Sequence, residues 1–297
     1  MSYKNMEQKI KKAVVLTAGF GTRFLPATKS YPKSLLTIVD RPVTHYLADE
    51  ISSSGIEKIF FIVGARGVTV KNYFAPNTHL ELFLDERGKT YLAEEFKKIQ
   101  SSARFAYIRQ QKANGTGGAL LLVERHIGQN PFARVYADDV IDSVEPCLLQ
   151  LMRAYEKYHA PILALKRVPK KDVWRYGVIH GRKVGARTYK IEKVIEKPDV
   201  KNAPSNLVSI GRFVLTPEIV RELRSIRPSD NHEICLTEAF NGFLKKGGEI
   251  FGYEFEGTRF DCGDKLGFMK AVVHYGIKHP EIGKQFYKHL KSLRFES

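Results

Sequence analysis

A glycine-rich, basic loop near the start of the chain has the residue types needed to bind an anion. It follows an apolar run that ends at Leu16, and it contains Gly19 and Gly21. Because glycine has no Cβ and accepts a positive φ, backbone N–H groups at such positions can approach a bound phosphate closely. Arg23 and Lys33 can add charge-assisted hydrogen bonds to phosphate oxygens. The loop is therefore a candidate phosphate site, with a basic surface turn that binds no ligand as the alternative.

This loop differs from the dinucleotide-binding loop of Rossmann folds. A Rossmann loop passes directly into a helix and carries a third glycine three residues after the second, where this chain has Phe24. Pro26 and Pro32 each fix their own φ and restrict the preceding residue, so a continuous helix is not expected before Pro42. We therefore expect the loop to wrap around its ligand rather than to cap it with a helix end.

Three carboxylates at predicted strand ends have the chemistry of a magnesium site. Asp138 and Asp139 follow the predicted strand 133–137, and Asp261 follows a later strand. Mg²⁺ prefers oxygen ligands and usually completes its shell with substrate phosphates. Helix capping or solvated turn acids are the alternative for such residues. The cationic loop favours the metal, because phosphates, Mg²⁺ and basic side chains act together in phosphoryl and nucleotidyl transfer.

Two more segments offer polar groups for a nucleotide and a sugar phosphate. Gln110 could read the edge of a base through its amide, and Gly115 and Gly117 leave room for a flat ring, with a flexible surface loop as the alternative. Glu196 could accept from sugar hydroxyls and Lys197 could hold a phosphate, with an exposed ion pair as the alternative. Gly177 allows backbone contact where a side chain would clash.

The elements that would position these residues alternate between strands and helices, at a spacing typical of α/β folds. In the first half of the chain, strands are expected at 13–16, 58–63, 104–109, 133–137 and 162–168. Helices are expected between them at 42–55, 68–74, 80–99 with a break near Gly88, 120–126 and 148–158. Ligands of such sheets bind at the carboxyl ends of the parallel strands. We therefore expect the loops after three of these strands, 13–16, 104–109 and 133–137, to converge on one edge of the sheet.

The second half of the chain adds antiparallel strands at 176–180, 189–195 and 207–214 and a strand at 249–255. It also adds helices at 217–226, 233–245 and 266–293, the last with a break at Pro280. The predicted fold class is therefore α/β, with a mixed, mostly parallel central sheet flanked by helices. We find no linker, so we expect a single domain over 1–297, with a short N-terminal tail at 1–11 and a helical C-terminal segment from about 264 to 297. Such helices could pair subunits, so a homo-oligomer is expected.

The formal net charge of +16 over 297 residues favours anionic partners. No run of five or more Lys or Arg is present, so we interpret the charge as a field that steers a phosphorylated ligand, and a nucleic-acid partner is not favoured. Cys147, Cys235 and Cys262 lie far apart without C-x-x-C spacing, which indicates reduced thiols. No stretch is long enough to span a bilayer. We expect a soluble, cytoplasmic protein with no membrane partner.

With these elements in order, the chain resembles the bacterial UTP–glucose-1-phosphate uridylyltransferases, also called UDP-glucose pyrophosphorylases. The resemblance extends from Lys12 to about Lys284. It rests on the order and spacing of short motifs: AGFGTRFLPATK (18–29), PK (32–33), VDRP (39–42), ADD (137–139), YGVI (176–179), EKP (196–198), APSNL (203–207), GR (211–212) and DCG (261–263). It implies the Rossmann-like sheet of nucleotide-diphospho-sugar transferases, UTP and glucose 1-phosphate as substrates, UDP-glucose and pyrophosphate as products, and Mg²⁺ as cofactor.

The resemblance also implies roles for individual residues. Arg23 and Lys33 would hold the triphosphate and act in catalysis. Asp138 and Asp261 would bind Mg²⁺, with Asp138 preferred over Asp139 because it takes the family's position at the strand end. The residues that would hold glucose 1-phosphate are Gly177, Glu196 and Lys197. The nucleotide would contact Ala18, Gly19, Gly21, Thr22, Gln110 and Gly115.

Two segments depart from the pattern of this family. Where the family usually reads Pro-Lys-Glu-Met-Leu-Pro, this chain has Ser34 in place of the carboxylate and Thr37 in place of the second proline. Where the family often has Gly-Leu-Gly-His-Ala, this chain has GTGGA at 115–119. These differences leave two alternatives open. One is a sister enzyme that uses another base, as in dTTP, or another sugar, and the other is a weakly active or non-catalytic binder of nucleotide sugars with a regulatory role.

Overall fold

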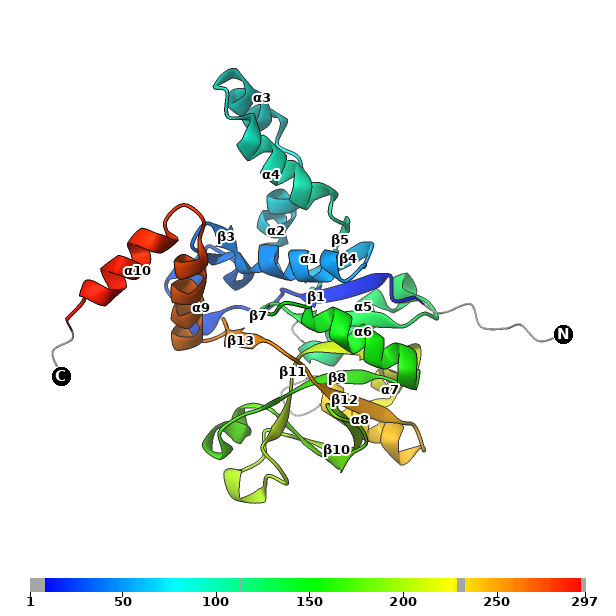
Figure 1. Ribbon diagram of the computed structural model, residues 1–297. Helices are drawn as coiled ribbons and strands as arrows, with labels where there is room; N and C mark the ends of the chain where they lie inside the picture. The colour runs from blue at the N-terminus through cyan, green and yellow to red at the C-terminus, as the bar shows by residue number, and fades with distance from the viewer. Residues whose placement is uncertain (1–8, 113, 229–232, 295–297) are drawn as a thin grey trace.

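The computed structural model describes residues 9–112, 114–228 and 233–294. Its centre is a twisted sheet with β1 (Lys12–Leu16) near the middle (Figure 1). Ala13, Val14 and Val15 are completely buried, because helices cover both faces of this strand. From one edge to the other, the strands are β5 (Arg104–Arg109), β4 (Lys58–Val63), β1, β6 (Phe132–Tyr136), β11 (Leu207–Leu215), β8 (Ile162–Arg167), β12 (Ile250–Glu254), β10 (Thr188–Glu196) and β9 (Gly177–Lys183).

The strand directions confirm the predicted mixed, mostly parallel sheet. Among the described residues, β10 and β11 run against the direction of the other strands of this sheet. Strands β5, β4, β1 and β6 are parallel neighbours, so their carboxyl ends lie at one edge. The loops after β1, β5 and β6 therefore start from the same edge, as the sequence predicted.

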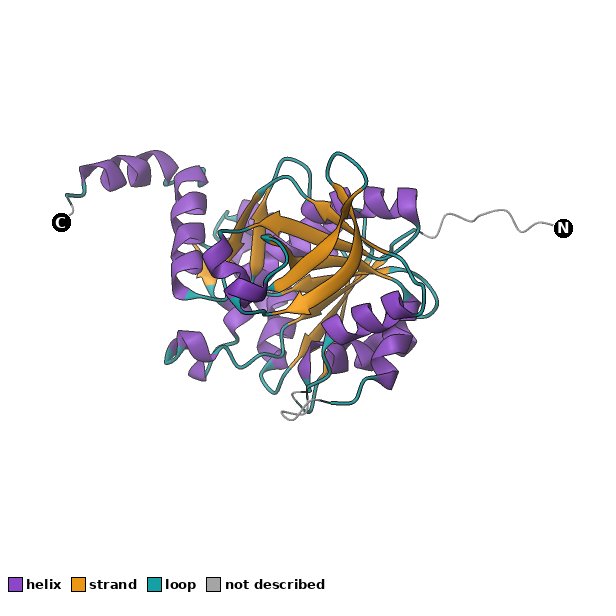
Figure 2. Cartoon of the chain, turned by 90° about the horizontal axis from the view of Figure 1, so that it is seen from below, coloured by secondary structure: helices purple, strands orange, loops and turns teal. Residues whose placement is uncertain are grey.

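Helices pack on both faces of the sheet and form two apolar cores (Figure 2). On one face lie α1 (Val43–Ser53), α2 (Gly67–Phe74) and α6 (Cys147–Tyr158). On the other lie α5 (Gly115–Ile127), α7 (Pro217–Ser225) and α8 (Leu236–Lys245). Alternate residues of β1 serve the two cores, since Ala13 and Val15 pack in the first and Val14 packs in the second.

Two short sheets that the sequence did not predict lie beside the main one. Strand β7 (Asp139–Asp142) pairs antiparallel with β13 (Thr258–Asp261), and β2 (Thr37–Ile38) pairs with β3 (Arg41–Pro42). The predicted loop from β6 directly into a helix was therefore wrong, because β7 intervenes before α6. The pairing matters for the site, since its register sets Asp139 opposite Asp261.

The helical parts of the basic loop after β1 are single 3₁₀ turns, at Thr22–Phe24, Ala27–Lys29 and Lys33–Leu35, and α1 begins only at Val43. The prediction that proline would keep a continuous helix out of this segment is confirmed. Helix α5, by contrast, begins at Gly115, earlier than the predicted start at 120. Glycine is required at position 117 of this helix, because a Cβ there would lie only 2.7 Å from the carbonyl oxygen of Ile234.

Two helical pairs extend from the sheet and its covering helices. Helices α3 (Thr78–Glu86) and α4 (Thr90–Ser101) form a projecting hairpin, and α9 (Lys265–Lys278) leads to α10 (Gly283–Ser292), which points away from the sheet (Figure 1). The predicted helix breaks near Gly88 and Pro280 are confirmed. Residues 1–8 of the predicted tail and 295–297 of the predicted C-terminal segment lie outside the described residues. No helix within the described ranges has the length and apolar character needed to cross a membrane.

Candidate active site

A cavity of about 630 Å³ lies at the carboxyl ends of β1, β5 and β6 and continues along β10 and β11. Its walls bring together residues that are far apart in the sequence. The predicted site residues that line it are Ala18, Gly19, Arg23, Lys33, Gln110, Gly115, Asp138, Gly177, Glu196, Lys197 and Asp261. Gly21 and Thr22 do not line it. The convergence of loops expected from the parallel strands therefore produces one common site.

Two aspartates face the same small space at one end of this cavity. A Cβ built on Gly263 would lie 2.8 Å from Asp138 Oδ2 and 2.9 Å from Asp261 Oδ1. Glycine at this position thus leaves open a cradle between two carboxylates. Carboxylate oxygens are the ligands that Mg²⁺ prefers, and two protein carboxylates with substrate phosphates form a common shell for this ion. The donor set fits such a cation with two protein carboxylates, although no group of three or more Asp, Glu, His or Cys side chains among the described residues is arranged to hold a metal ion by itself.

Asp139 has a different environment from its neighbour Asp138. It is 4% exposed, its Oδ2 accepts from the backbone N–H of Gly211 at 2.9 Å, and its Oδ1 accepts from Arg259 Nε at 2.6 Å. Both of its oxygens are therefore engaged by protein donors. The side chain of Asp138 is 31% exposed and accepts from Lys33 Nζ at 2.6 Å. Of the two aspartates, Asp138 is thus the more accessible to a ligand.

Burial and neighbouring charges both shift the pKa values of Asp261 and Arg259 near this cradle. Burial raises the pKa of Asp261 above its ordinary value, and Asp139 and Asp138 raise it further, while Arg259 lowers it. Burial alone would lower the pKa of Arg259, but Asp139 and Asp261 hold it above its ordinary range. The guanidinium therefore stays charged. Since the negative charges of Asp138 and Asp139 oppose ionisation of Asp261, an added cation would stabilise its carboxylate form.

The basic loop folds over Lys33 and presents it to the cavity. Gly21 has a φ of 69°, in the left-handed region, and its carbonyl oxygen accepts from Thr28 Oγ1 at 2.7 Å. A Cβ at Gly21 would lie 2.9 Å from the Cβ of Lys33. This glycine is thus needed for the close packing of the loop on itself, and it contributes to the site through the position of Lys33.

The far wall of the cavity combines an amide with the start of helix α5. Gln110 Nε2 donates to Asn114 Oδ1 at 2.8 Å, and Gly115 follows with a φ of 80°. The sequence had suggested that Gly115 and Gly117 could admit a flat ring, but Ile234 packs against both. Its carbonyl oxygen accepts from Gly117 N–H at 3.0 Å and would lie 3.0 Å from a Cβ on Gly115. The start of α5, which carries the positive end of the helix dipole, and the open space at Gly19 both border the cavity.

The third wall is built from the ends of β9 and β10. Gly177 is paired with Glu196, whose Oε2 accepts from Thr237 Oγ1 of α8 at 2.7 Å. Lys197 follows with a φ of 43°, a left-handed conformation that is uncommon for a residue with a side chain. Its backbone N–H donates to the carbonyl oxygen of Tyr176 at 3.0 Å. This local strain is held by the pairing on either side, and strain of this kind is found mainly at functional sites.

Several residues that line the cavity were not singled out from the sequence. Arg175 Nη2 donates to Asp261 Oδ2 at 3.1 Å, and Arg259 contacts the same carboxylate at 3.4 Å. Thr237 holds Glu196, and Tyr136 and Phe213 form an aromatic wall with ring centroids 6.0 Å apart. The two arginines adjoin motifs that were recognised, since one precedes the YGVI segment and the other precedes the DCG segment. The contact of Thr237 with Glu196 had no local signal.

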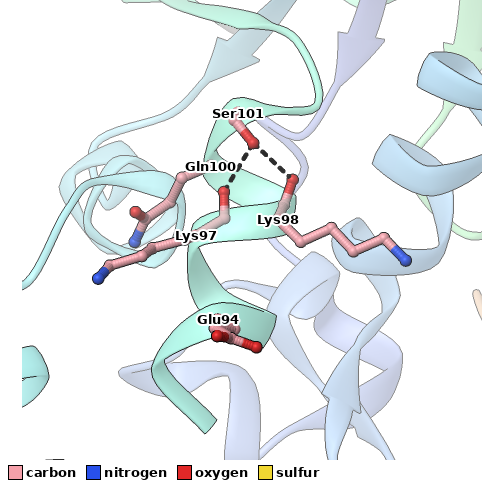
Figure 3. A pocket seen from close by; sticks show the side chains of 5 residues that line it. All are labelled: Glu94, Lys97, Lys98, Gln100 and Ser101. Atoms are coloured by element: carbon pink, nitrogen blue, oxygen red, sulfur yellow. Dashed lines mark hydrogen bonds between the residues drawn. The ribbon is translucent and has the colours of Figure 1, made fainter. Parts of the chain in front are cut away.

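A separate hollow lies on the projecting hairpin. Its lining residues all come from α4, and Figure 3 shows the side chains of Lys97 and Lys98 extending in different directions. Ser101 Oγ donates to the carbonyl oxygens of both lysines, at 2.8 and 3.2 Å, so it is engaged within its own helix. Because these polar groups do not converge on a common point, this hollow offers no binding constellation comparable to that of the cavity at the sheet edge.

Comparison with known proteins agrees with this geometry. The family model described as nucleotidyl transferase matches residues 12–276. The UTP–glucose-1-phosphate uridylyltransferase of Staphylococcus epidermidis is 39% identical over 287 residues, which cover 96% of this chain and 99% of the relative. The UTP-bound UGPase structure from Acinetobacter baumannii is 34% identical, covers 96% of this chain and all of its own, and superposes with a TM-score of 0.89. A UDP-glucose pyrophosphorylase complexed with UDP-glucose is 36% identical, covers 91% and 100% of the two chains, and gives a TM-score of 0.83. The chain therefore belongs to the nucleotidyl transferase family, among its UTP–glucose-1-phosphate uridylyltransferases.

Proposed function

We propose that this protein makes UDP-glucose and pyrophosphate from UTP and glucose 1-phosphate. The observation that carries the proposal is the cavity itself, in which Arg23 and Lys33 of the basic loop, the carboxylates of Asp138 and Asp261, and the Glu196–Lys197 pair share one space. The close similarity to uridylyltransferases over nearly the whole chain supports the same reaction.

The proposed reaction is a direct nucleotidyl transfer. A phosphate oxygen of glucose 1-phosphate attacks the α-phosphorus of UTP, the new P–O bond forms as the bond to the β-phosphate breaks, and pyrophosphate leaves with that electron pair. No protein nucleophile is required. Arg23 and Lys33 hold the triphosphate and stabilise the charge that develops on its oxygens, and the fixed walls of the cavity align the two substrates.

We propose Mg²⁺ as the cofactor, with Asp138 and Asp261 as its protein ligands. The carboxylate cradle opened by Gly263 supports this choice. When bound, the ion would neutralise phosphate charge and polarise the phosphorus that is attacked. Arg175 and Arg259 hold Oδ2 of Asp261, while Oδ1, which borders the cradle, accepts from the backbone N–H of Gly263 at 3.0 Å.

The remaining site residues divide between the two substrates in this proposal. The uracil would contact Ala18, Gly19, Gln110 and Gly115, and the neighbouring Gly21 and Thr22 would shape the nucleotide loop. Glucose 1-phosphate would lie against Gly177, with Glu196 accepting from sugar hydroxyls and Lys197 contacting the phosphate. The hydrogen bond from Thr237 to Glu196 supports this arrangement, since it fixes the carboxylate at the cavity wall.

We also propose that residues 1–297 form one domain, and that the protein is a cytoplasmic homo-oligomer. The three cysteines are free, which is consistent with a reducing compartment. The pairing surface would lie on α9, α10 and the residue that follows α10, where large apolar side chains are exposed: Leu266, Met269, Ile277, Tyr287 and Leu293. Light scattering of the purified protein tests the assembly.

A substrate panel tests the reaction. Pyrophosphate release is measured with UTP, dTTP and other nucleoside triphosphates against several sugar 1-phosphates, in the presence of Mg²⁺. We expect the highest kcat/KM for UTP with glucose 1-phosphate. Release with dTTP but not with UTP would move the assignment to a thymidylyltransferase. Binding of UDP-glucose in calorimetry without any turnover would instead indicate a regulatory binder.

A further inference from the structure

The side chain of Arg259 contacts three oxygens from three different segments. Its Nε donates to Asp139 Oδ1 at 2.6 Å, its Nη1 donates to the hydroxyl of Tyr176 at 3.0 Å, and its Nη2 lies 3.4 Å from Asp261 Oδ2. The side chain is only 14% exposed. A planar guanidinium can satisfy these directions at once, whereas the point charge of a lysine cannot.

One of the three contacts is an anchor. Besides its bond to Arg259, Asp139 accepts from Gly211 N–H at 2.9 Å, and its carbonyl oxygen accepts from Arg212 Nη2 at 2.7 Å. Arg212 is completely buried and is held by Glu50 of α1, with Nη2 to Oε2 at 2.6 Å. Asp139 is therefore fixed to β11 and, through it, to the helical layer on the first face of the sheet.

The other two contacts lie at opposite ends of the candidate site. Asp261 is one wall of the carboxylate cradle at Gly263. Tyr176 immediately precedes Gly177, and its carbonyl oxygen accepts from the N–H of the strained Lys197. The position of Tyr176 thus sets the turn that would receive glucose 1-phosphate.

We propose that Arg259 is a positioning residue that holds the metal-binding carboxylate and the sugar-phosphate turn in a fixed mutual arrangement, with Asp139 as its anchor. This inference rests on the proposed function of the cavity. Arg259 itself need not touch a substrate. Arg175, which precedes Tyr176 in the chain, also donates to Asp261 Oδ2, at 3.1 Å. Among the described residues, Arg259 is the side chain that joins both Asp261 and the Tyr176 hydroxyl to the anchor at Asp139.

The two ends can be separated by mutation. Tyr176→Phe removes only the hydroxyl that accepts from Arg259, so it should raise KM for glucose 1-phosphate about fivefold, the effect of one hydrogen bond, and leave the Mg²⁺ concentration for half-maximal activity unchanged. Arg259→Met should raise both quantities by about tenfold or more, and Arg259→Lys should fall between the two. Calorimetric titration of the protein with Mg²⁺ alone should show the weaker metal binding of Arg259→Met without reference to turnover.

Two matched variants serve as controls. Tyr46→Phe removes a hydroxyl that donates to the carbonyl oxygen of Ile38 away from the cavity, and Arg187→Met removes a guanidinium paired with the Glu254 carbonyl. Both should leave KM and the Mg²⁺ response unchanged.

If Arg259→Met and Tyr176→Phe lower Tm but alter neither KM for glucose 1-phosphate nor Mg²⁺ binding, Arg259 is merely structural and the inference is wrong. A loss confined to kcat would also overturn it. A wild-type protein that binds Mg²⁺ but turns over no UTP would refute the proposed function instead.

Discussion

Two completely buried arginines on neighbouring strands should respond in opposite ways to the same substitution. Arg134 of β6 has no hydrogen-bond partner for Nε, Nη1 or Nη2 within the described chain. Its guanidinium carbon lies 3.6 Å from the ring centroid of Tyr136 and 4.8 Å from that of Phe213. Arg212 of β11 is paired with Glu50 through Nε and Nη2. Replacing each with Met keeps an unbranched apolar stem and removes only the charged head.

The expected magnitudes follow from these environments. Burial of an ion without a partner costs several kcal/mol even after relaxation, whereas contact with desolvated aromatic rings returns about 2 kcal/mol. Arg134→Met should therefore raise the free energy of unfolding by about 1–3 kcal/mol. Arg212→Met should lower it by about 3–5 kcal/mol, because Glu50 is left as an uncompensated buried charge.

Thermal and urea unfolding of the two variants measure these changes. For a protein of this size, each kcal/mol should shift Tm by roughly 2–4 °C. Arg134→Leu serves as a second apolar replacement, in case the shape of methionine does not suit the site. A fall in Tm for both Arg134 variants would refute the reasoning, since it would mean that the stacked guanidinium stabilises the folded state.

The remaining predictions concern the candidate site. Gly263→Ala places a methyl group within 3 Å of Asp138 and Asp261. The Mg²⁺ concentration for half-maximal activity should therefore rise at least tenfold, with Tm little changed. An unaltered Mg²⁺ response in pyrophosphate release would exclude the cradle as the metal site. Lys197→Ala should raise KM for glucose 1-phosphate by about tenfold with KM for UTP nearly constant, and an unchanged rate would remove this lysine from the site. Gly21→Ala should lower Tm and kcat together, because the left-handed φ of 69° and the close approach of Lys33 Cβ both oppose a side chain at this position. A variant with wild-type Tm would contradict that explanation.

The sequence predicted the main elements of the fold because their signals are local. The runs 58–63 and 104–109 are β-branched and aromatic, and they form β4 and β5 with the predicted bounds. Strands β7 and β13 were missed because each has only four residues and pairs with no strand of the main sheet. Their pairing depends on tertiary contact across more than a hundred residues, and no pattern within either segment reports it.

The candidate site shows the same division between local and distant causes. Asp138, Asp261 and Lys33 were found from strand ends and loop composition, and the structure brings them to one cavity. Arg259 was missed because its role depends on Asp139 and Tyr176, neither of which is near it in the sequence. A side chain whose partners come from other segments carries no periodic or compositional signal of its own.

The ion pair between Lys33 and Asp138 links the free protein to the proposed reaction. In the structure, Lys33 Nζ donates to the cavity-facing oxygen of Asp138, and the side chain of Lys33 is 21% exposed. Lys33 therefore offsets part of the repulsion between Asp138 and Asp261 before any substrate binds. In the proposed reaction, a cation bound with the triphosphate would lie against these carboxylates, and the ammonium would then donate to phosphate oxygens instead. The lysine would thus have a partner of opposite charge in both states, and this exchange would couple nucleotide binding to metal binding at Asp138.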